Sequence, residues 1–451
     1  MARIFKPGGA KRASSESTPS LLQIESLSQD GRGVARHEGK TVFVDGGLPG
    51  EEVEVSHYRR QKRFSECQAK QITSASSDRI EPVCPVFSEC GGCQLQHLQP
   101  NKQLLLKQQA LLASLQRQHN LKPEKLVEPI HSPSEGYRNR VRFGIDRNQC
   151  LSFRRKQSDQ LVAIKTCPVL HPALDALISP LQAWLDDLPA KSGVTHVEMI
   201  QALDENGGDQ SVLVVRHIKP LDSVHRESLQ SQLAEVSCWF QGKKNGELTD
   251  AGQQPVDDEL YLRLDAESLS LAFQPGDFTQ VNDAVNQQMV VQAMDWLQPS
   301  REDRIADLFC GMGNFSLAIA RRAGRVLGIE GSEAMVQRAA ANAERNRLKN
   351  TEFVALNLES AQLLNRLNQQ GINKLLLDPP RAGAKAVCEQ LASSQMERIV
   401  YVSCNPASFA RDAAVLVAAG YSLASLRSMD MFPHTSHMET MALFVHASDG
   451  Q

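Results

Sequence analysis

The chain has 451 residues, of which 22% are charged and 41% hydrophobic, and its formal net charge is −3. This length suits two or three domains with substantial cores. No apolar run reaches the roughly 18–20 residues that span a bilayer, and the basic N-terminus leads into a Ser-rich segment, so we expect neither a membrane anchor nor a signal peptide. The ten cysteines are therefore expected to be reduced, and clustered ones indicate metal binding or catalysis.

The N-terminal part predicts a small β-barrel. Residues 1–20 are basic and polar, which predicts a disordered tail. Residues 21–74 contain five short strand-like runs between glycine turns, a pattern typical of an OB-like barrel. The turns at 30–33 (D-G-R-G) and 46–51 (G-G-L-P-G-E), with the basic run 59–63, resemble the TRAM domain, an RNA-binding barrel. A generic barrel with a solvated charged edge is the alternative.

A cysteine cluster follows in a loop rich in Gly and Pro. Cys84, Cys90 and Cys93 have the spacing C-x5-C-x2-C, which favours a metal site over core packing. A tetrahedral zinc ion and a cubane iron–sulfur cluster both need a fourth ligand. Cys167 is the best candidate because a Cys-Pro ending recurs in cluster loops. The spacing leaves zinc and iron–sulfur open, and we assign the site to a central α+β domain at 75–268.

Two features of this central part suggest contact with other surfaces. Residues 101–120 have helical spacing of leucines, and we expect this helix to pack on the C-terminal domain. In the alternating run 137–143, Arg138, Arg140 and Arg142 share one face of a strand. Residues 101–165 carry thirteen Lys and Arg against five Asp and Glu. The arginine stripe predicts an RNA surface, with a merely solvated face as the alternative.

Residues 269–451 alternate strands and helices, which predicts a Rossmann-like α/β domain with a largely parallel sheet. Ligands of such sheets bind beyond the carboxyl ends of the strands. The turn after the first strand, 307–315, has two glycines but lacks the third glycine of the dinucleotide fingerprint. The next three strands end at Glu330, Asn357 and Asp378. Glu330 suits a ribose, Asn357 suits an adenine edge, and Asp378 adds a further polar group. S-adenosylmethionine (SAM) fits this pattern best.

The run I-V-Y-V-S-C-N at 399–405 predicts a buried strand that ends at Cys404. Asn405 is a good N-cap, Pro406 suits the first helical position, and Gly420 suits the end of that helix. A helix amino end favours a thiolate, so Cys404 is a candidate nucleophile, with an inert buried cysteine as the alternative.

The loop F-P-H-T-S-H-M-E at 432–439 precedes the last predicted strand. His434, His437 and Glu439 could form a metal triad, but beside a SAM pocket they suit acid–base chemistry better. Glu439 is the candidate base, and a surface glutamate is the alternative. The D-P-P-R run invites comparison with amino-methyltransferases, yet Arg381 replaces the aromatic residue that stacks on the flipped base there.

Five motifs together resemble the RNA uracil-C5 methyltransferases that use SAM. They are F-T-Q-V-N (278–282), D-L-F-C-G-M-G-N-F (307–315), L-D-P-P-R-A-G (377–383), S-C-N-P (403–406) and F-P-H-T-x-H-x-E (432–439). With the barrel and the cysteines, the resemblance spans nearly the whole chain. It is greatest to the branch that acts on one uridine of 23S rRNA, of the position-1939 type, and carries a TRAM barrel and a [4Fe–4S] cluster.

Because the family has other branches, the resemblance leaves open which uridine is modified. The branch for another 23S uridine generally lacks the barrel, and the tRNA branch lacks the cluster. A few barrel-bearing enzymes modify two 23S positions. The main rival from another class is a non-catalytic RNA-binding ribosome-assembly factor, which the intact Cys404 and Glu439 argue against.

The resemblance implies roles for specific residues. SAM contacts are expected from Gln280, Phe309, Asn314, Glu330, Asn357 and Asp378, and [4Fe–4S] ligation from Cys84, Cys90, Cys93 and Cys167. Cys404 is expected to attack uracil C6, and Glu439 to remove the C5 proton. We expect a cytoplasmic, monomeric enzyme with 23S rRNA as its partner and no membrane association.

Overall fold

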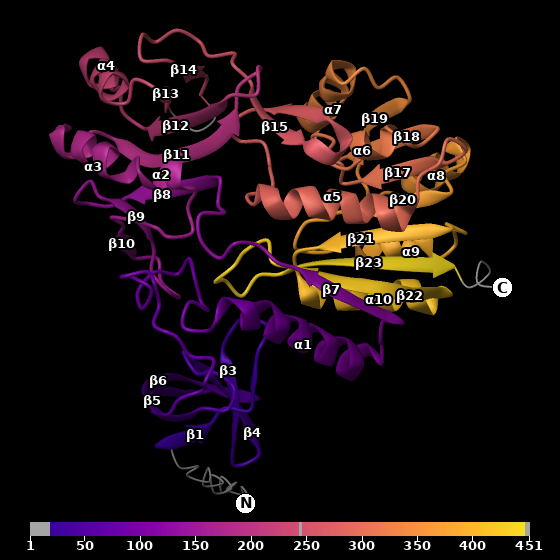
Figure 1. The fold of residues 1–451 in the computed structure, drawn as a ribbon, viewed down its shortest axis with the longest axis horizontal. Helices are drawn as coiled ribbons and strands as arrows, with labels where there is room; N and C mark the ends of the chain where they lie inside the picture. The colour runs from indigo at the N-terminus through magenta and orange to yellow at the C-terminus, as the bar shows by residue number, and fades with distance from the viewer. Residues whose placement is uncertain (1–18, 243–245, 447–451) are drawn as a thin grey trace, which may run out of the picture. The chain divides into compact units, whose positions relative to one another are not determined.

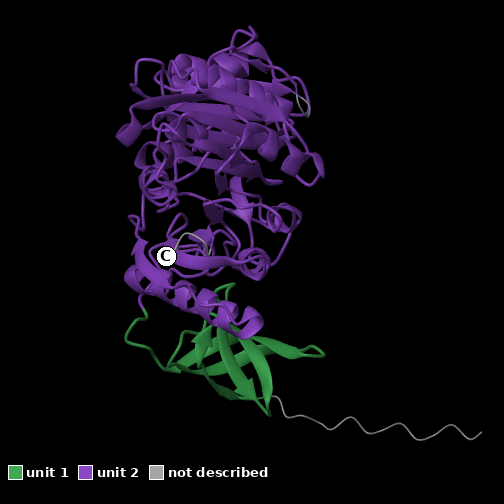
Figure 2. Ribbon diagram, turned by 90° about the vertical axis from the view of Figure 1, so that its right-hand side faces the viewer, with its two compact units in different colours: residues 1–79 green, residues 80–451 purple. Residues whose placement is uncertain are grey.

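The structure is a computed structural model that describes residues 19–242 and 246–446. The predicted tail at 1–20 lies almost entirely outside the described residues. The chain, drawn in Figure 1, divides into two compact units, residues 1–79 and residues 80–451 (Figure 2). Of the helices in the described ranges, none is long and apolar enough to cross a membrane.

Unit 1 contains one six-stranded sheet, ordered β1-β5-β6-β4-β3-β2. Its strands are β1 (Leu21–Gln23), β2 (Ser26–Leu27), β3 (Gly33–His37), β4 (Lys40–Asp45), β5 (Glu52–Arg60) and β6 (Phe64–Ser74). Inward side chains such as Ile24, Val42 and Val53 form a core of their own. A Cβ atom at Gly33 would lie 2.8 Å from the carbonyl oxygen of Gly47, so this turn requires glycine. The all-β prediction for this part is confirmed.

The first half of unit 2 is built on a nine-stranded sheet. Its main path runs β10-β9-β8-β11-β12-β13-β14, β15 pairs with β11, and β16 pairs with β15. The strands are β8 (Arg140–Ile145), β9 (Leu151–Arg154), β10 (Leu161–Ala163), β11 (Val194–Leu203), β12 (Asp209–His217), β13 (Ser237–Gly242), β14 (Leu248–Thr249), β15 (Leu260–Leu264) and β16 (Leu269–Phe273). The helices are α2 (Pro172–Asp175), α3 (Ile178–Asp187), α4 (Ser223–Gln232) and the short η1 (Asp265–Glu267). One face of the sheet packs against α3 through Phe143, Met199 and Trp184.

The second half of unit 2 contains an eight-stranded sheet, ordered β19-β18-β17-β20-β21-β23-β22-β7. Its strands are β7 (Lys125–Ile130), β17 (Arg304–Leu308), β18 (Arg325–Glu330), β19 (Thr351–Ala355), β20 (Lys374–Leu377), β21 (Arg398–Ser403), β22 (Tyr421–Met429) and β23 (Glu439–His446). The strands from β19 to β21 are parallel, and β23 runs antiparallel to both β21 and β22. The predicted Rossmann-like α/β fold is therefore confirmed.

Alternating side chains of this C-terminal sheet fill two cores, one on each face. The helices are α1 (Pro100–His119), α5 (Asp283–Leu297), α6 (Ser316–Ala320), α7 (Glu333–Arg345), α8 (Gln362–Gln370), α9 (Lys385–Leu391) and α10 (Pro406–Ala418). Ile399 and Tyr401 face the core that contains α1, α8, α9 and α10, whereas Val400 and Val402 face α5 and α6. Helix α5 also packs against the central sheet, and Figure 1 shows it lying across the C-terminal sheet.

Several segments link the two halves of unit 2. Helix α1 packs against α10 and β22, and β7 extends the C-terminal sheet by pairing with β22 in parallel. The β15–β16 hairpin spans the predicted boundary between residues 268 and 269. The limits of the central and C-terminal domains stay predictions, since the structure presents the two halves as one compact unit.

The buried side chain of Asn342 in α7 connects this hairpin to the turn after β17. Its Nδ2 donates to the carbonyl oxygens of Ala272 (3.0 Å) and Met312 (3.1 Å), and its Oδ1 accepts from the Ala272 N–H (2.8 Å). We expect Asn342→Ala to lower the free energy of unfolding by about 2–4 kcal/mol, because buried backbone groups lose their partners. Urea denaturation followed by circular dichroism measures this. Asn365→Ala, on the exposed face of α8, is the control and should change it by less than about 0.5 kcal/mol; equal effects would contradict the assignment.

Candidate active site

The carboxyl ends of neighbouring parallel strands meet at one edge of the C-terminal sheet. Glu330 is the last residue of β18, Phe309 follows β17, Asp378 follows β20 and Cys404 follows β21. Asn357 lies two residues beyond the end of β19 rather than on it. Ligands of open α/β sheets bind at this edge, so the strand ends define the candidate site.

Glu439 reaches the same edge from the opposite direction. Because β23 is antiparallel to β21, its amino end lies beside the carboxyl end of β21. Ser403 is paired with Thr440, and the continuation of this register sets Cys404 opposite Glu439. Opposite residues in an antiparallel pair have Cα atoms about 4.5–5.5 Å apart, with side chains on one face. The two predicted catalytic residues therefore come together, and Glu439 is only 5% exposed.

The helix after Cys404 begins as the sequence predicts. Asn405 is the N-cap of α10, and its side chain accepts a hydrogen bond from the Ala407 N–H at 3.0 Å. Pro406 occupies the first turn, and Gly420 has a φ of +97° just after the helix. The Asn405 Nδ2 donates to the Arg381 carbonyl at 2.9 Å, which ties the D-P-P-R segment to the Cys404 turn. These contacts fix the backbone on both sides of the thiol.

The turn after β17 leaves space for a ligand beside its backbone. Phe309, Gly311 and Gly313 all have positive φ angles, of 63°, 53° and 99°. A Cβ at Gly313 would clash with Leu317, whereas the space around Gly311 is open. The Glu330 carboxylate accepts from the Gly311 N–H at 3.2 Å, and so the strand end and the turn are held together.

The remaining predicted SAM residues have contacts that orient them. Asn314 exchanges two side-chain hydrogen bonds, of 3.0 and 3.1 Å, with Asn286 of α5, which is 3% exposed. Asn357 accepts from the backbone of Glu359 at 3.0 Å. The Gln280 side chain lines the groove described below. The positions of all six residues are compatible with one binding site at the sheet edge.

Burial dominates the electrostatics of the site. It raises the pKa of Asp378 to about 7, and burial together with the Asp378 charge raises the pKa of Glu439 to about 8. Burial, Glu439 and Asp378 raise the pKa of Cys404 to about 11, and Arg381 opposes them only partly. Burial and the two carboxylates therefore outweigh, in the free protein, the pKa-lowering effect that was predicted for the helix amino end.

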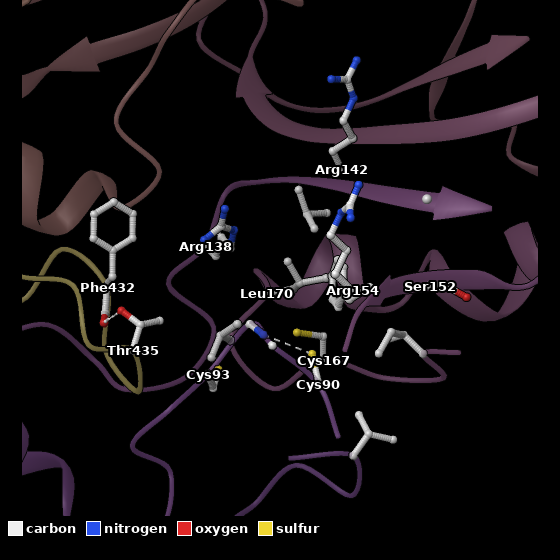
Figure 3. A pocket seen from close by; sticks show the side chains of 18 of the residues that line it. Cys90, Cys93, Arg138, Arg142, Ser152, Arg154, Cys167, Leu170, Phe432 and Thr435 are labelled. Atoms are coloured by element: carbon white, nitrogen blue, oxygen red, sulfur yellow. Dashed lines mark hydrogen bonds between the residues drawn. The ribbon is translucent and has the colours of Figure 1, made fainter. Parts of the chain in front are cut away.

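One open groove of about 1280 Å³ joins this site to the cysteine cluster. Its lining includes Cys404, Glu439 and Arg381 at the sheet edge and the exposed Phe278 beside them. Further along, the lining includes Arg138, Arg142 and Arg154, and Figure 3 shows Cys90 and Cys167 close together with the Arg142 side chain pointing away from them. The groove thus combines a reactive thiol, buried carboxyls and exposed cations.

Arg140 does not belong to this cationic surface. Its guanidinium forms an ion pair of 2.8 Å with Glu198, which also pairs with Arg216 at 3.0 Å. It also donates to the carbonyl of Asp277 and to the Thr279 hydroxyl. The predicted arginine stripe is therefore wrong at Arg140, because a buried glutamate on the neighbouring strand β11 captures it. Arg140 instead supports the segment that carries Gln280.

The four predicted metal ligands Cys84, Cys90, Cys93 and Cys167 all line the groove. Burial and the neighbouring thiols raise the pKa of Cys93 to about 11 and that of Cys167 to about 12. The Gly92 N–H donates to the Cys90 sulfur at 3.4 Å. Within the described ranges, no three His, Cys, Asp or Glu side chains converge on the position of a single metal ion. The four thiols are thus mutual neighbours without forming a mononuclear site.

Several functional candidates escaped the sequence interpretation. Arg381 was noted only for the missing aromatic ring, although it is the cation that acts on Cys404. His437, which the sequence analysis named for acid–base chemistry, does line the groove, and burial and nearby cations lower its pKa. Phe278 was noted only as part of a motif, yet it is 75% exposed. The one signal in the sequence for these residues was an apolar Phe278 directly before a polar motif.

The pKa values predict how Cys404 reacts with iodoacetamide. Its alkylation rate should rise with pH towards about 11, because only the thiolate reacts. Glu439→Gln should move this profile to lower pH by removing a nearby negative charge, and Arg381→Met should move it to higher pH. Mass spectrometry of the Cys404 peptide gives the rate, with Cys404→Ala as the control for peptide assignment. A profile that neither substitution moves would contradict the proposed neighbourhood.

Comparisons with known proteins agree with this geometry. The tRNA (Uracil-5-)-methyltransferase family matches residues 100–447, and the TRAM domain matches residues 21–56. A Pectobacterium atrosepticum protein, named 23S rRNA (uracil(1939)-C(5))-methyltransferase RlmD, is 44% identical over 432 residues, or 94% of this chain and 93% of that protein. A protein of that name from Pseudomonas aeruginosa is 40% identical over 451 residues, or 98% of this chain and 97% of that protein.

A solved structure has the same fold. It is the Pyrococcus abyssi tRNA (uracil-54, C5)-methyltransferase in complex with S-adenosyl-L-homocysteine, with a TM-score of 0.71 and 22% identity. The similarity covers 94% of this chain and all of that chain. The chain belongs to the tRNA (uracil-5-)-methyltransferase family and is a SAM-dependent RNA (uracil-C5)-methyltransferase with an N-terminal TRAM domain.

Proposed function

We propose that this enzyme methylates C5 of one uridine in 23S rRNA, of the position-1939 type, through a covalent adduct with Cys404. The observation that carries the proposal is the register of β21 and β23, which sets Cys404 opposite Glu439 at the edge where the SAM residues lie. The choice of RNA rests on the relatives, which are named for that uridine, and on identities of 40–44% over nearly the whole chain.

SAM would be held by Gln280, Phe309, Asn314, Glu330, Asn357 and Asp378. When bound, SAM supplies an electrophilic methyl group. Support comes from the open space at Gly311 and from the acidic strand ends, which suit the hydroxyl groups of a ribose. The Asn286–Asn314 pair would keep the turn in position while the ligand enters.

Uracil C5 is a weak nucleophile, and Cys404 would activate it. The sulfur of Cys404 would form a bond to C6 as the thiol gives its proton to solvent in the open groove, and the C5=C6 electron pair would move towards O4 as an enolate. C5 would then take the methyl group from the SAM sulfur, which would keep both electrons of the broken S–C bond, and C5 would become tetrahedral. The Glu439 carboxylate removes the remaining C5 proton, the C5=C6 bond re-forms, and the S–C6 bond breaks to release the thiolate. Covalent catalysis thus divides one difficult substitution into easier steps.

The pKa values specify when each group acts. With a pKa raised to about 8, the Glu439 carboxyl is mostly protonated at pH 7 and accepts a proton more strongly than an ordinary glutamate. Cys404 is a neutral thiol in the free enzyme, so its ionisation accompanies attack on C6. The Glu439 charge is one of the causes that raise the pKa of Cys404, so an ionised Glu439 disfavours the thiolate.

The RNA would lie along the groove. The exposed Arg142 and Arg154, the latter paired with Asp159, and the half-buried Arg138 would supply cations for phosphates, and the flipped base would occupy the end near Cys404 and Phe278. The TRAM domain would bind a further part of the RNA. We propose a monomer that acts on ribosomal RNA in the cytoplasm. Methylation of tRNA or of another 23S uridine is the alternative.

We also propose that Cys84, Cys90, Cys93 and Cys167 hold a [4Fe–4S] cluster. A zinc ion with Zn–S bonds of about 2.3 Å needs four sulfur atoms roughly 3.8 Å apart around one position. In a cubane cluster each thiolate binds a different iron atom, so the sulfurs surround a wider space. Gly91 and Gly92 let the cysteine loop pass close to the neighbouring backbone. A Cβ at Gly91 would lie 3.1 Å from the carbonyl oxygens of Arg154 and Arg155.

Two variants test the covalent mechanism. Cys404→Ala should abolish methyl transfer, since C5 is then not activated, while SAM still binds. Glu439→Gln should let the adduct form but not resolve, which slows turnover by about 10²–10⁴-fold and leaves RNA attached to protein on a denaturing gel. Turnover by Cys404→Ala, or release of the adduct by Glu439→Gln at the wild-type rate, would contradict the roles assigned.

The target is tested separately. Mass mapping of 5-methyluridine in 23S rRNA and tRNA from a deletion strain should show loss of the modification at one 23S position. Loss from tRNA instead would favour the alternative branch. If no position changed and tritium release from 5-³H-uridine RNA were absent, the protein would be the non-catalytic assembly factor.

The cluster proposal predicts composition and colour. Protein purified without oxygen should be brown, absorb near about 400 nm and contain about four iron and four sulfide ions per chain. Cys167→Ser should lose them, whereas Cys150→Ser, a half-exposed cysteine outside the groove, should keep them. A colourless protein with one zinc ion would contradict the proposal.

A further inference from the structure

The loop of residues 430–438, which precedes Glu439, is held on two sides by other elements. It closes the hairpin of β22 and β23, in which Met429 pairs with Glu439. His434, within the loop, has a φ of +67°, a conformation that a residue with a side chain rarely adopts without support from its surroundings. The loop also carries Phe432, Thr435 and His437 to the groove. Its conformation therefore shapes the space around the base.

Helix α1 holds the loop from one side. The Lys107 ammonium group donates to the Asp430 carboxylate (2.9 Å), to the carbonyl of His437 (2.9 Å) and to that of Thr435 (3.3 Å). The side chains of Lys107 and Asp430 are only 4% and 5% exposed. Gln103 accepts from the His434 N–H at 2.7 Å. These buried contacts fix the two ends of the loop to one rigid helix.

The segment directly after Cys93 holds the loop from the other side. The backbone N–H groups of Gln94 and Leu95 both donate to the His434 carbonyl, at 2.9 and 2.8 Å. The side-chain amide of Gln94 then forms a bridge: its Nε2 donates to the Gly91 carbonyl at 2.8 Å, and its Oε1 accepts from the Ser436 N–H at 3.1 Å. One side chain thus connects the cysteine loop to the loop that precedes the base.

We propose that Gln94 is a positioning residue for Glu439, and that through it the order of the cysteine loop sets the geometry of proton removal. This inference rests on the proposed function, in which Glu439 removes the C5 proton. The pairing of Glu439 with Met429, and of the adjacent Thr440 with Ser403, fixes the Glu439 backbone in the sheet. Gln94 holds the backbone that precedes Glu439 at Ser436. Loss of this bridge therefore loosens the Glu439 carboxyl and the groove wall beside it.

The kinetic consequence is specific to one step. Attack of Cys404 on C6 and gain of the methyl group do not use Glu439, whereas removal of the C5 proton does. Weaker positioning therefore slows resolution of the adduct more than its formation. A residue with a merely structural role would slow both steps alike or lower the amount of folded protein.

Three variants separate these effects. Gln94→Met keeps the side-chain length but removes both hydrogen bonds of the amide. Gln94→Glu keeps an acceptor for the Ser436 N–H and loses the donor to Gly91. Gln118→Met, on the exposed face of α1, is the matched control for the same substitution. The full-length protein is used, with an RNA fragment that contains the target uridine and SAM.

Two measurements are made on each variant. The first is the rate of adduct formation and of adduct resolution in a single turnover, read on denaturing gels. The second is amide hydrogen exchange of the peptide that covers residues 432–439, in the absence of RNA. For Gln94→Met we expect resolution to slow about fivefold or more, as for the loss of one net hydrogen bond, with formation changed less than about twofold. Exchange at Ser436 should be faster.

Gln94→Glu keeps the acceptor for the Ser436 N–H, so exchange at Ser436 should stay close to that of the wild type, whereas resolution should slow because the bond to Gly91 is lost. Gln118→Met should match the wild type in both measurements. The inference is overturned if Gln94→Met keeps the wild-type ratio of the two rates, or if exchange at 432–439 does not change. Cys404→Ala and Glu439→Gln run beside these variants. If Cys404→Ala still forms the adduct, or Glu439→Gln still resolves it, the proposed mechanism fails, and that failure is distinct from a normal result with Gln94→Met.

Discussion

The antiparallel pairing of β23 with β21 is the constraint on which the site depends. In a wholly parallel sheet, only residues that follow strands reach the ligand edge. Reversal of one strand brings a residue that begins a strand, Glu439, to the same edge and opposite Cys404. Two groups from different parts of the sequence thereby acquire a fixed separation that backbone hydrogen bonds, rather than flexible loops, maintain.

Burial gives these groups their unusual chemistry. A carboxyl withdrawn from water binds its proton more tightly, which makes Glu439 a stronger base once it ionises. The same burial keeps Cys404 neutral in the free enzyme, and Arg381 is the cation close enough to favour its ionisation. A protonated thiol reacts slowly with electrophiles, so burial lowers the intrinsic reactivity of Cys404 in the free protein.

Much of the fold and of the site could be predicted from the sequence because the signals are local. Strand runs that end in a polar residue located Glu330, Asp378 and Cys404, and the cap of Asn405 and Pro406 located the helix after the thiol. Contacts between distant segments could not be predicted in this way. Period-two alternation placed Arg140 on a face but could not show that Glu198, on another strand, pairs with it.

The contacts of the loop of residues 430–438 and the pKa values of the site could not be predicted from the sequence for the same reason. Nothing in the run around Lys107 indicates a partner more than three hundred residues away, yet its buried ion pair with Asp430 anchors the loop before Glu439. Likewise Gln94 is an unremarked glutamine in the sequence, and its bridge depends on how α1, the cysteine loop and the β22–β23 hairpin pack. The raised pKa of Cys404 follows from burial, which local helix-end chemistry does not include.

The central claim is that Cys404 bonds to C6 of the target uridine and that a separate base must then remove a proton from C5. RNA carrying 5-fluorouridine at the target tests this directly, because fluorine cannot leave C5 as a proton does. With SAM present, mass spectrometry of the digested complex should find the methylated fluorouridine attached to the peptide that contains Cys404. Absence of an adduct, or an adduct on another residue, would contradict the account.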